Sequence, residues 1–264
     1  MIYMAWNSDR IKQLWIVAAY SQHYDMAEKA GLELVNELSD TRHYGQLYEV
    51  LRDNSLSERV IETAKKYLIN YEKNQIKSYE ESEDYPALIS FASDNSKTDE
   101  GRYAAGMSVI SAYRICGGNT FGLKLMAANK DLPDAVREAA GRTAVKLYLE
   151  DSTSGAFYLK EMCLDPSFLE VVREYAGMAA IKAYLNDSHS GPIGLKSLAK
   201  DSNAPYSVRA AAERELINLA YQYTKDLKLG DVKNPLAGDG LTVRPTKKNS
   251  PNPPKQKKPI RLSR

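Results

Sequence analysis

Apolar residues recur every three or four positions along most of this chain, which is the spacing of one face of an α-helix. The segment 133–149 reads PDAVREAAGRTAVKLYL, and its Val136, Ala140 and Ala144 fall on one stripe. A shorter apolar stretch precedes each such segment, as residues 123–128 do here. No segment shows the sustained apolar–polar alternation of a half-buried strand. The pattern predicts pairs of helices, a shorter helix A followed after a short turn by a longer helix B.

The helix pairs repeat with a nearly constant period. Segments 133–149, 169–185 and 205–221 align without gaps, and each carries a valine, then an arginine, then an alanine three residues after the arginine. A fourth copy lies upstream, and two weaker copies precede it. Alanines mark the six copies at spacings of 34, 41, 35, 36 and 36 residues, and they are Ala30, Ala64, Ala105, Ala140, Ala176 and Ala212. Because one helix pair cannot bury its own apolar faces, the repetition predicts pairs that stack into one continuous core.

Three glycines occupy a position where a helix would normally avoid them. Gly106, Gly141 and Gly177 each follow one of the marker alanines. Glycine in a helix interior costs about 1 kcal/mol relative to alanine. Its recurrence in one register therefore indicates a place where another helix comes too close for a side chain. We expect these glycines to be contact points between helices.

The pattern resembles the HEAT repeat, in its short HEAT-like form. The residues that carry the resemblance match the family's Asp…Pro…Val-Arg…Ala signature, and they are Asp131, Pro133, Val136, Arg137, Ala140 and Val145. The resemblance covers roughly residues 10–223 and is weakest in the first two copies, where Ala27 and Ile61 replace the arginine. It implies an all-α fold, a right-handed α-solenoid (an α–α superhelix) of about six HEAT-like helix pairs over residues 1–225.

In the HEAT family, the turn aspartate and the helix-B arginine form a ladder between successive turns and helices. The resemblance therefore implies a structural role for four aspartate–arginine pairs, which could otherwise look catalytic. They are Asp94 with Arg102, Asp131 with Arg137, Asp165 with Arg173, and Asp201 with Arg209. An aspartate in the turn can also cap helix B.

The 41-residue spacing between the second and third copies comes from an insertion at residues 72–84, EKNQIKSYEESED. The insertion is acidic and bears a tyrosine. We interpret it as a solvated loop or as an extension of the preceding helix. A docking loop is the functional alternative, since insertions in repeat proteins map to loops on one face.

The sequence offers little for catalysis. Its only histidines, His23, His43 and His189, form neither a His-Glu pair nor a helical His-x3-His pair. This argues against the iron-dependent hydroxylases built from HEAT-like repeats and against zinc catalysis. His189 lies between two serines in a turn, where adjacent residues rarely meet the geometry of a catalytic triad. Cys116 and Cys163 are most simply buried apolar side chains. We expect no catalytic residue, no metal and no cofactor.

Helix B usually lines the concave face in HEAT-type solenoids. If this holds here, its polar positions form columns that point into the groove, interspersed with methionines. The candidate binding residues are Arg142, Lys146, Lys182, Arg214 and Asn218. Such a surface could recognise an acidic or amphipathic segment of a protein or peptide. A simply solvated face is the alternative.

Charge separates the C-terminal end from the rest. The chain has 36 basic and 34 acidic residues, but residues 240–264 hold eight basic and no acidic ones, which leaves 28 basic against 34 acidic in residues 1–239. Six of the eleven prolines lie after residue 225. With few apolar residues to bury, we expect residues 226–264 to be a disordered basic tail. It could bind nucleic acid or another polyanion, or fold back on the acidic body, through Arg244, Lys247, Lys248, Lys255, Lys257, Lys258 and Arg261.

Three functional hypotheses follow. The first is a non-catalytic protein–protein interaction scaffold or adaptor that binds its partner on the concave helix-B face. The second is a nucleic-acid-associated adaptor that uses the basic tail. The third is an enzyme of a HEAT-containing family, such as a lyase. The apolar stretches are too short to span a membrane, and the N-terminus lacks the apolar region of a secretory signal. We expect no membrane insertion and a cytoplasmic location, or a nuclear one in a eukaryote.

Overall fold

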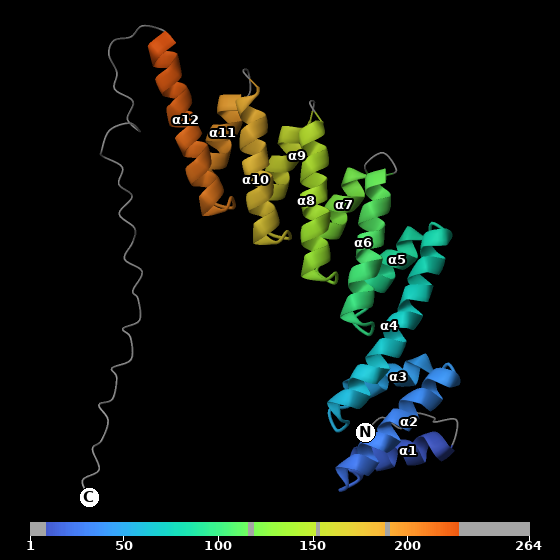
Figure 1. The fold of residues 1–264 in the computed structure, drawn as a ribbon. Helices are drawn as coiled ribbons and strands as arrows, with labels where there is room; N and C mark the ends of the chain where they lie inside the picture. The colour runs from blue at the N-terminus through green and yellow to red at the C-terminus, as the bar shows by residue number, and fades with distance from the viewer. Residues whose placement is uncertain (1–8, 116–118, 152–153, 188–190, 227–264) are drawn as a thin grey trace, which may run out of the picture. The chain divides into compact units, whose positions relative to one another are not determined.

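The computed structural model describes residues 9–115, 119–151, 154–187 and 191–226. Within these ranges the chain forms α-helices and no strand, which confirms the all-α prediction (Figure 1). The chain divides into two units, residues 1–212 and residues 213–264. The second unit is described only as far as residue 226. The basic tail residues from Arg244 to Arg261, like Cys116 and His189, lie outside the described residues.

Short and long helices alternate along the described chain, as the sequence predicts. The odd-numbered helices take the place of helix A and the even-numbered ones that of helix B. Their bounds are α1 (Asp9–Tyr20), α2 (Tyr24–Asp40), α3 (Tyr44–Arg52), α4 (Glu58–Glu81), α5 (Tyr85–Ser93), α6 (Asp99–Ile115), α7 (Thr120–Ala128), α8 (Asp134–Glu150), α9 (Gly155–Leu164), α10 (Glu170–Leu185), α11 (Gly191–Lys200) and α12 (Tyr206–Asp226).

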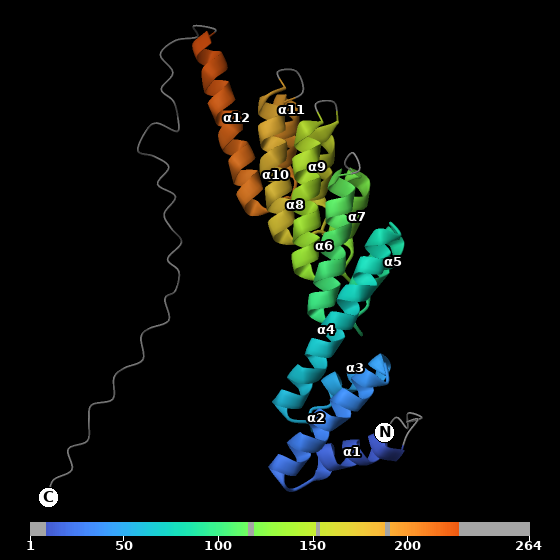
Figure 2. The ribbon, with the colours of Figure 1, turned by 45° about the vertical axis from the view of Figure 1, so that its right-hand side comes forward.

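In the first unit the B helices contact one another in chain order, from α2 through α4, α6 and α8 to α10. Helices α3, α5, α7 and α9 each pack between two B helices, their own and the preceding one. Helix α7, for example, contacts α8 and α6, and α9 contacts α10 and α8. Figures 1 and 2 show α6, α8 and α10 side by side, with α7 and α9 in a second layer. The B helices of this unit therefore form one series of neighbouring contacts, with A helices packed between them.

The core of the first unit follows the alanine register found in the sequence. All six marker alanines are buried, and all except Ala30 have no exposed surface. Equivalent leucines of three A helices, Leu123, Leu159 and Leu195, are fully buried against them. The small alanine side chain lets the helices approach, and the leucines of the A layer fill the remaining space.

The predicted glycine contacts are confirmed. A Cβ atom built on Gly106, Gly141 or Gly177 would lie 2.5–2.6 Å from a valine methyl group of the next B helix, which leaves no room for it. The valines belong to the repeated Val-Arg signature. We call this contact a valine–glycine joint. Its four instances are Gly31 with Val60, Gly106 with Val136, Gly141 with Val172, and Gly177 with Val208.

The contact between α4 and α6 is different. The glycine position of α4 is taken by Lys65, and the valine position of α6 is taken by Gly101. The insertion is neither a solvated loop nor a docking loop over most of its length, because it continues α4 as a helix to Glu81. Its first residue, Glu72, is fully buried and lies where a Cβ on Gly101 would stand. The interpretation as an extension of the preceding helix is therefore confirmed, while Glu72 itself is not solvated.

Candidate functional site

The turns between helices A and B are held by side-chain oxygens. In the turns that follow α3, α5, α7, α9 and α11, Oδ1 of one residue accepts a hydrogen bond from the backbone N–H two residues later. The distances are 2.9 Å for Asp53 with Ser55, 2.8 Å for Asp94 with Ser96, 2.8 Å for Asp165 with Ser167 and 3.0 Å for Asp201 with Asn203. Hydrogen bonding from Ser96, chiefly its side chain, holds the pKa of the Asp94 carboxyl below its usual value.

The turn between α7 and α8 requires a correction. Here Oδ1 of Asn129 accepts the N–H of Asp131, at 3.0 Å. Asp131 was predicted to be the turn aspartate of the ladder, but it lies two residues further along. The register is Asp94, Asn129, Asp165 and Asp201, with spacings of 35, 36 and 36 residues. An amide oxygen accepts the same hydrogen bond as a carboxylate, so a search for aspartate alone selected the wrong residue.

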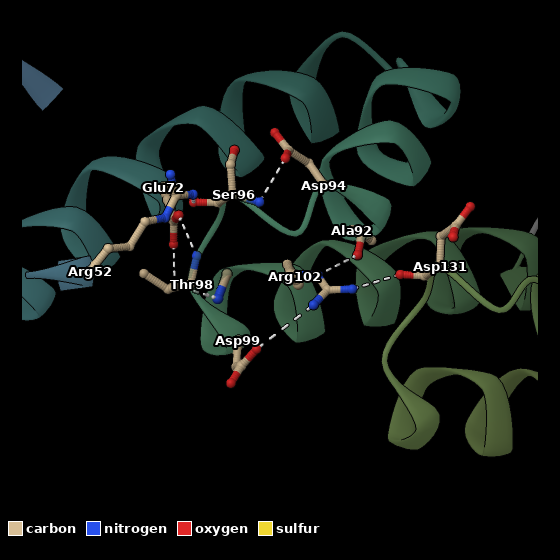
Figure 3. A network of polar contacts seen from close by, with 10 residues as sticks. Arg52, Glu72, Ala92, Asp94, Ser96, Thr98, Asp99, Arg102 and Asp131 are labelled. Carbon is tan, nitrogen blue, oxygen red and sulfur yellow. Dashed lines mark hydrogen bonds and ion pairs between the residues drawn. The ribbon is translucent and has the colours of Figure 1, made fainter. Parts of the chain in front are cut away.

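The repeated arginines connect successive copies through backbone carbonyl groups. The guanidinium groups of Arg102, Arg137 and Arg173 donate from Nε to a carbonyl in the last turn of their own A helix, at 3.0–3.4 Å, and from Nη2 to a carbonyl in the next turn between helices A and B; Figure 3 shows this for Arg102. The acceptors are Ala92 and Asp131 for Arg102, Ala127 and Ser167 for Arg137, and Cys163 and Asn203 for Arg173. The last carbonyl groups of a helix lack intrahelical hydrogen-bond donors, so a guanidinium there donates to acceptors that would otherwise be unpaired.

The ladder is thus made of arginine and backbone rather than of arginine and aspartate side chains. Within the described residues no ion pair joins the ladder arginines to the turn aspartates. Arg102 and Arg137 instead face carboxylates of their own first helical turns, Asp99 at 3.8 Å and Asp134 at 2.9 Å. Arg209 ends the series, because its buried Nε has no hydrogen-bond partner and its guanidinium lies 5.9 Å from the Tyr206 ring centroid.

Glu72 forms a buried polar network where α4 meets α6. Its Oε1 accepts hydrogen bonds from the Tyr48 hydroxyl at 2.6 Å and from the Thr98 N–H at 2.9 Å, and its Oε2 accepts one from the Thr98 hydroxyl. Burial, reinforced by the Glu72 carboxylate, raises the pKa of Tyr48. The Lys97 ammonium lies 4.9 Å from the Tyr48 ring centroid. Since the carboxylate is enclosed and faces three donors, its role is to hold three segments together.

In the same region Arg52 makes one of the contacts that the repeated arginine makes in other copies. The second copy has Ile61 where the signature has arginine. Arg52, at the end of α3, donates from Nη2 to the carbonyl of Ser96 over a long 3.5 Å (Figure 3). Ser96 is equivalent to the turn residues that accept from Arg102 and Arg137. The joint at α4 and α6 therefore keeps the turn contact but supplies it from a different helix.

The predicted helix-B binding residues are only partly brought together. Arg142 donates to Glu138 at 2.7 Å, and its guanidinium lies 5.0 Å from the Tyr175 ring centroid on the neighbouring B helix. Lys146 on α8 and Lys182 on α10 are exposed at equivalent positions. Arg214 and Asn218 belong to the second unit, where Asn218 donates to Glu215 at 3.3 Å.

Sequence reasoning missed a row of exposed apolar residues on the A helices. Phe121, Phe157 and Ile193 occupy equivalent positions in α7, α9 and α11, and they are 68%, 58% and 73% exposed. Their spacing of 36 residues is visible in the sequence, but the pattern predicts that a large apolar residue near the start of a helix is buried in the core. A cavity of about 850 Å³ is lined by Phe157 and Ile193 together with Tyr148 and Tyr184.

The described part of the chain contains no cluster of three His, Cys, Asp or Glu side chains arranged to hold a metal ion. None of its helices is both long and apolar enough to cross a membrane. No family model matches the chain, and no curated protein or solved structure is significantly similar to it.

Proposed function

We propose that this chain is a non-catalytic scaffold that binds a protein or peptide on the surface of stacked helix pairs. The observation that carries the proposal is the valine–glycine joint, which recurs in one register at four contacts between B helices. A structure that repeats one contact builds an extended surface made of equivalent positions. Extended surfaces of this kind are what helical repeat proteins use to bind other macromolecules.

The finer description of the fold is part of the same proposal. We infer a right-handed solenoid of about six HEAT-like helix pairs. Its support is the shared register of marker alanines, valine–glycine joints and arginine contacts to the next turn. The helix-B surface is the first candidate for binding, through Arg142, Lys146 and Lys182 in the first unit and Arg214 and Asn218 in the second.

A second candidate is binding of nucleic acid or another polyanion through the tail. It rests on the eight basic residues and no acidic ones in residues 240–264. Neutralising phosphates with basic side chains gives affinity that falls steeply with salt. A gel shift that disappears both in high salt and on deletion of residues 240–264 would support this candidate.

The scaffold function is tested by selecting ligands from a displayed library of random 12-residue peptides on the full-length protein. The scaffold predicts enrichment of related sequences that bind the purified protein in solution. For the helix-B surface, the double variant Lys146→Glu/Lys182→Glu should weaken selected ligands at least tenfold while the helical circular dichroism stays unchanged. A library that yields no reproducible binder would contradict the scaffold function.

A further inference from the structure

We propose that the A-helix surface of α7, α9 and α11 is a docking site for an acidic linear segment with apolar anchors. The inference rests on the proposed scaffold function and names a surface and a partner class that the helix-B interpretation does not include. Its starting point is the row of Phe121, Phe157 and Ile193. Single exposed apolar side chains are common, but three in one register on neighbouring helices form a patch.

A second row, of lysines, accompanies the apolar one. Lys124, Lys160 and Lys196 each follow an apolar residue by three positions, which places the two on one face of the helix. Contacts between the A helices show that the rows are continuous, since Lys124 reaches Glu161 at 3.0 Å and Lys160 reaches Ser197 at 2.7 Å. Each helix therefore presents one apolar and one basic position to the same side.

The cavity between α9 and α11 gives the apolar row a place to hold a side chain. Phe157 and Ile193 belong to its lining, as do Tyr148 and Tyr184. Gly194 leaves room for the Tyr184 ring, because a Cβ there would clash with the ring. At about 850 Å³ the cavity is in the range of ligand-binding clefts, which is roughly 300–1,000 Å³.

The charge of the A-helix surface indicates which charged groups a partner should have. Helices α7, α9 and α11 contain four lysines, Lys124, Lys160, Lys196 and Lys200, against one acid, Glu161. Glu161 is paired with Lys124, whereas Lys160 donates to a neutral hydroxyl and Lys196 is exposed. Asp151 and Asp187 also line the cavity, together with Lys160. Asp151 accepts the N–H and hydroxyl of Ser154. Over the surface of these three helices the lysines outnumber the single glutamate, so this surface favours a partner with carboxylates next to its apolar anchors.

The repeat also sets the spacing of the anchors. Neighbouring A helices lie within side-chain reach of one another, because Lys124 on α7 meets Glu161 on α9 and Lys160 on α9 meets Ser197 on α11. An extended segment in the polyproline II conformation presents every third side chain to the same side, over about 9 Å. Apolar residues three positions apart, with acidic residues between them, therefore match consecutive copies. The probe is the peptide Gly-Asp-Phe-Asp-Glu-Phe-Asp-Gly, labelled with a fluorophore, and its control replaces every Asp and Glu with Lys.

The test measures fluorescence anisotropy of both peptides with the full chain. We expect the acidic peptide to bind at least tenfold more tightly than its lysine control and to weaken as salt rises. Ile193→Ser and Lys196→Glu should each weaken it at least fivefold, and Lys160→Glu/Lys196→Glu at least tenfold. These side chains are at least partly exposed, and circular dichroism verifies that each variant is folded. Lys66→Glu/Lys73→Glu, a matched change of two exposed lysines on α4, should leave binding unchanged.

Equal binding of both peptides, or binding that survives the A-helix variants, would overturn the proposal. If the acidic peptide does not bind but the library yields ligands that depend on Lys146 and Lys182, the docking site is refuted and the scaffold function stands. If neither the peptide nor the library gives a binder, both are refuted. Binding lost in the A-helix variants alone supports both.

Discussion

Two contacts between B helices, α8 with α10 and α4 with α6, each place a larger side chain in the space left by a glycine. The two contacts exchange the helices on which the glycine and the larger side chain lie. In the first, Val172 of the later helix enters a gap left by Gly141 of the earlier one. In the second, Glu72 of the earlier helix occupies a gap left by Gly101 of the later one. Both joints need a glycine opposite a larger group. They differ in whether the earlier or the later helix supplies the glycine, and in whether the larger group is the apolar valine or the glutamate side chain.

The length of α4 explains how the exchange preserves the packing. Helix α4 has 24 residues, whereas α6 and α8 have 17 each. Seven extra residues make about two turns of helix, so they return nearly to the same face. Glu72 is seven residues after Lys65 and thus faces α6 as the missing glycine would have done. The comparison teaches that a repeat tolerates an insertion when its length keeps the helical phase.

The largest effect is expected from removing the charged group. Glu72→Ala leaves the Tyr48 hydroxyl and both Thr98 donors without their acceptor in a buried place, and each unpaired donor costs about 1–3 kcal/mol. We expect the free energy of unfolding to fall by about 3 kcal/mol or more, measured by urea denaturation. Glu72→Gln keeps the size and one acceptor oxygen, so it should cost less. An alanine variant as stable as the wild type would contradict the assignment.

A smaller loss is expected at the apolar joint. Gly141→Ala forces a Cβ to within 2.5 Å of a Val172 methyl group. Overpacking of this kind costs about 1–3 kcal/mol, and the gain in helix propensity, about 1 kcal/mol, offsets part of it. Gly45→Ala is the matched control, because nothing lies within 4 Å of the added Cβ on α3. Thermal unfolding should show the first variant destabilised and the second unchanged or stabilised.

The arginine contacts should contribute less. Arg137→Lys removes the fork that reaches the Ala127 and Ser167 carbonyls, and we expect a loss of about 1–2 kcal/mol. Arg209→Lys is the control, since the Nε of Arg209 has no partner to lose. Urea denaturation of both variants makes the comparison. Equal losses at the two positions would show that the carbonyl contacts add nothing.

The smallest effect concerns reactivity rather than stability. Burial raises the pKa of the Cys163 thiol to about 11, so at pH 8 it is almost entirely protonated. In a Cys116→Ser background, Cys163 should react with Ellman's reagent far more slowly than in urea. A Cβ at Gly177 would come within 2.8 Å of Sγ, so Gly177→Ala should open this joint and speed the reaction. Fast labelling of the folded parent would contradict its burial.

The regular joints could be predicted from the sequence because both of their signals are strong. A glycine that recurs inside helices is costly unless a neighbour needs the space, and the marker alanines fix the register. The α4–α6 joint gave no such signal. Glu72 opens an acidic segment, and only the contacts with Tyr48 and Thr98, from other parts of the chain, compensate for its burial.

Two features of the candidate sites could not be predicted from the sequence, for similar reasons. A motif defined by the residue type aspartate selects Asp131, whereas a motif defined by a side-chain hydrogen-bond acceptor selects Asn129. The row of Phe121, Phe157 and Ile193 has the right periodicity, but periodicity alone does not tell a buried stripe from an exposed one. Deciding between them requires the packing of neighbouring A helices, which depends on the whole repeat.

The most direct test of the joint is a double-mutant cycle between Gly141→Ala and Val172→Ala, with stability measured by urea denaturation. If the valine fills the glycine gap, Gly141→Ala should be costly while Val172 is present and nearly free or stabilising in the Val172→Ala background. The predicted coupling is about 1 kcal/mol or more in favour of the double variant. Strict additivity of the two changes would contradict the valine–glycine joint, and with it the repeated contact from which the scaffold function is inferred.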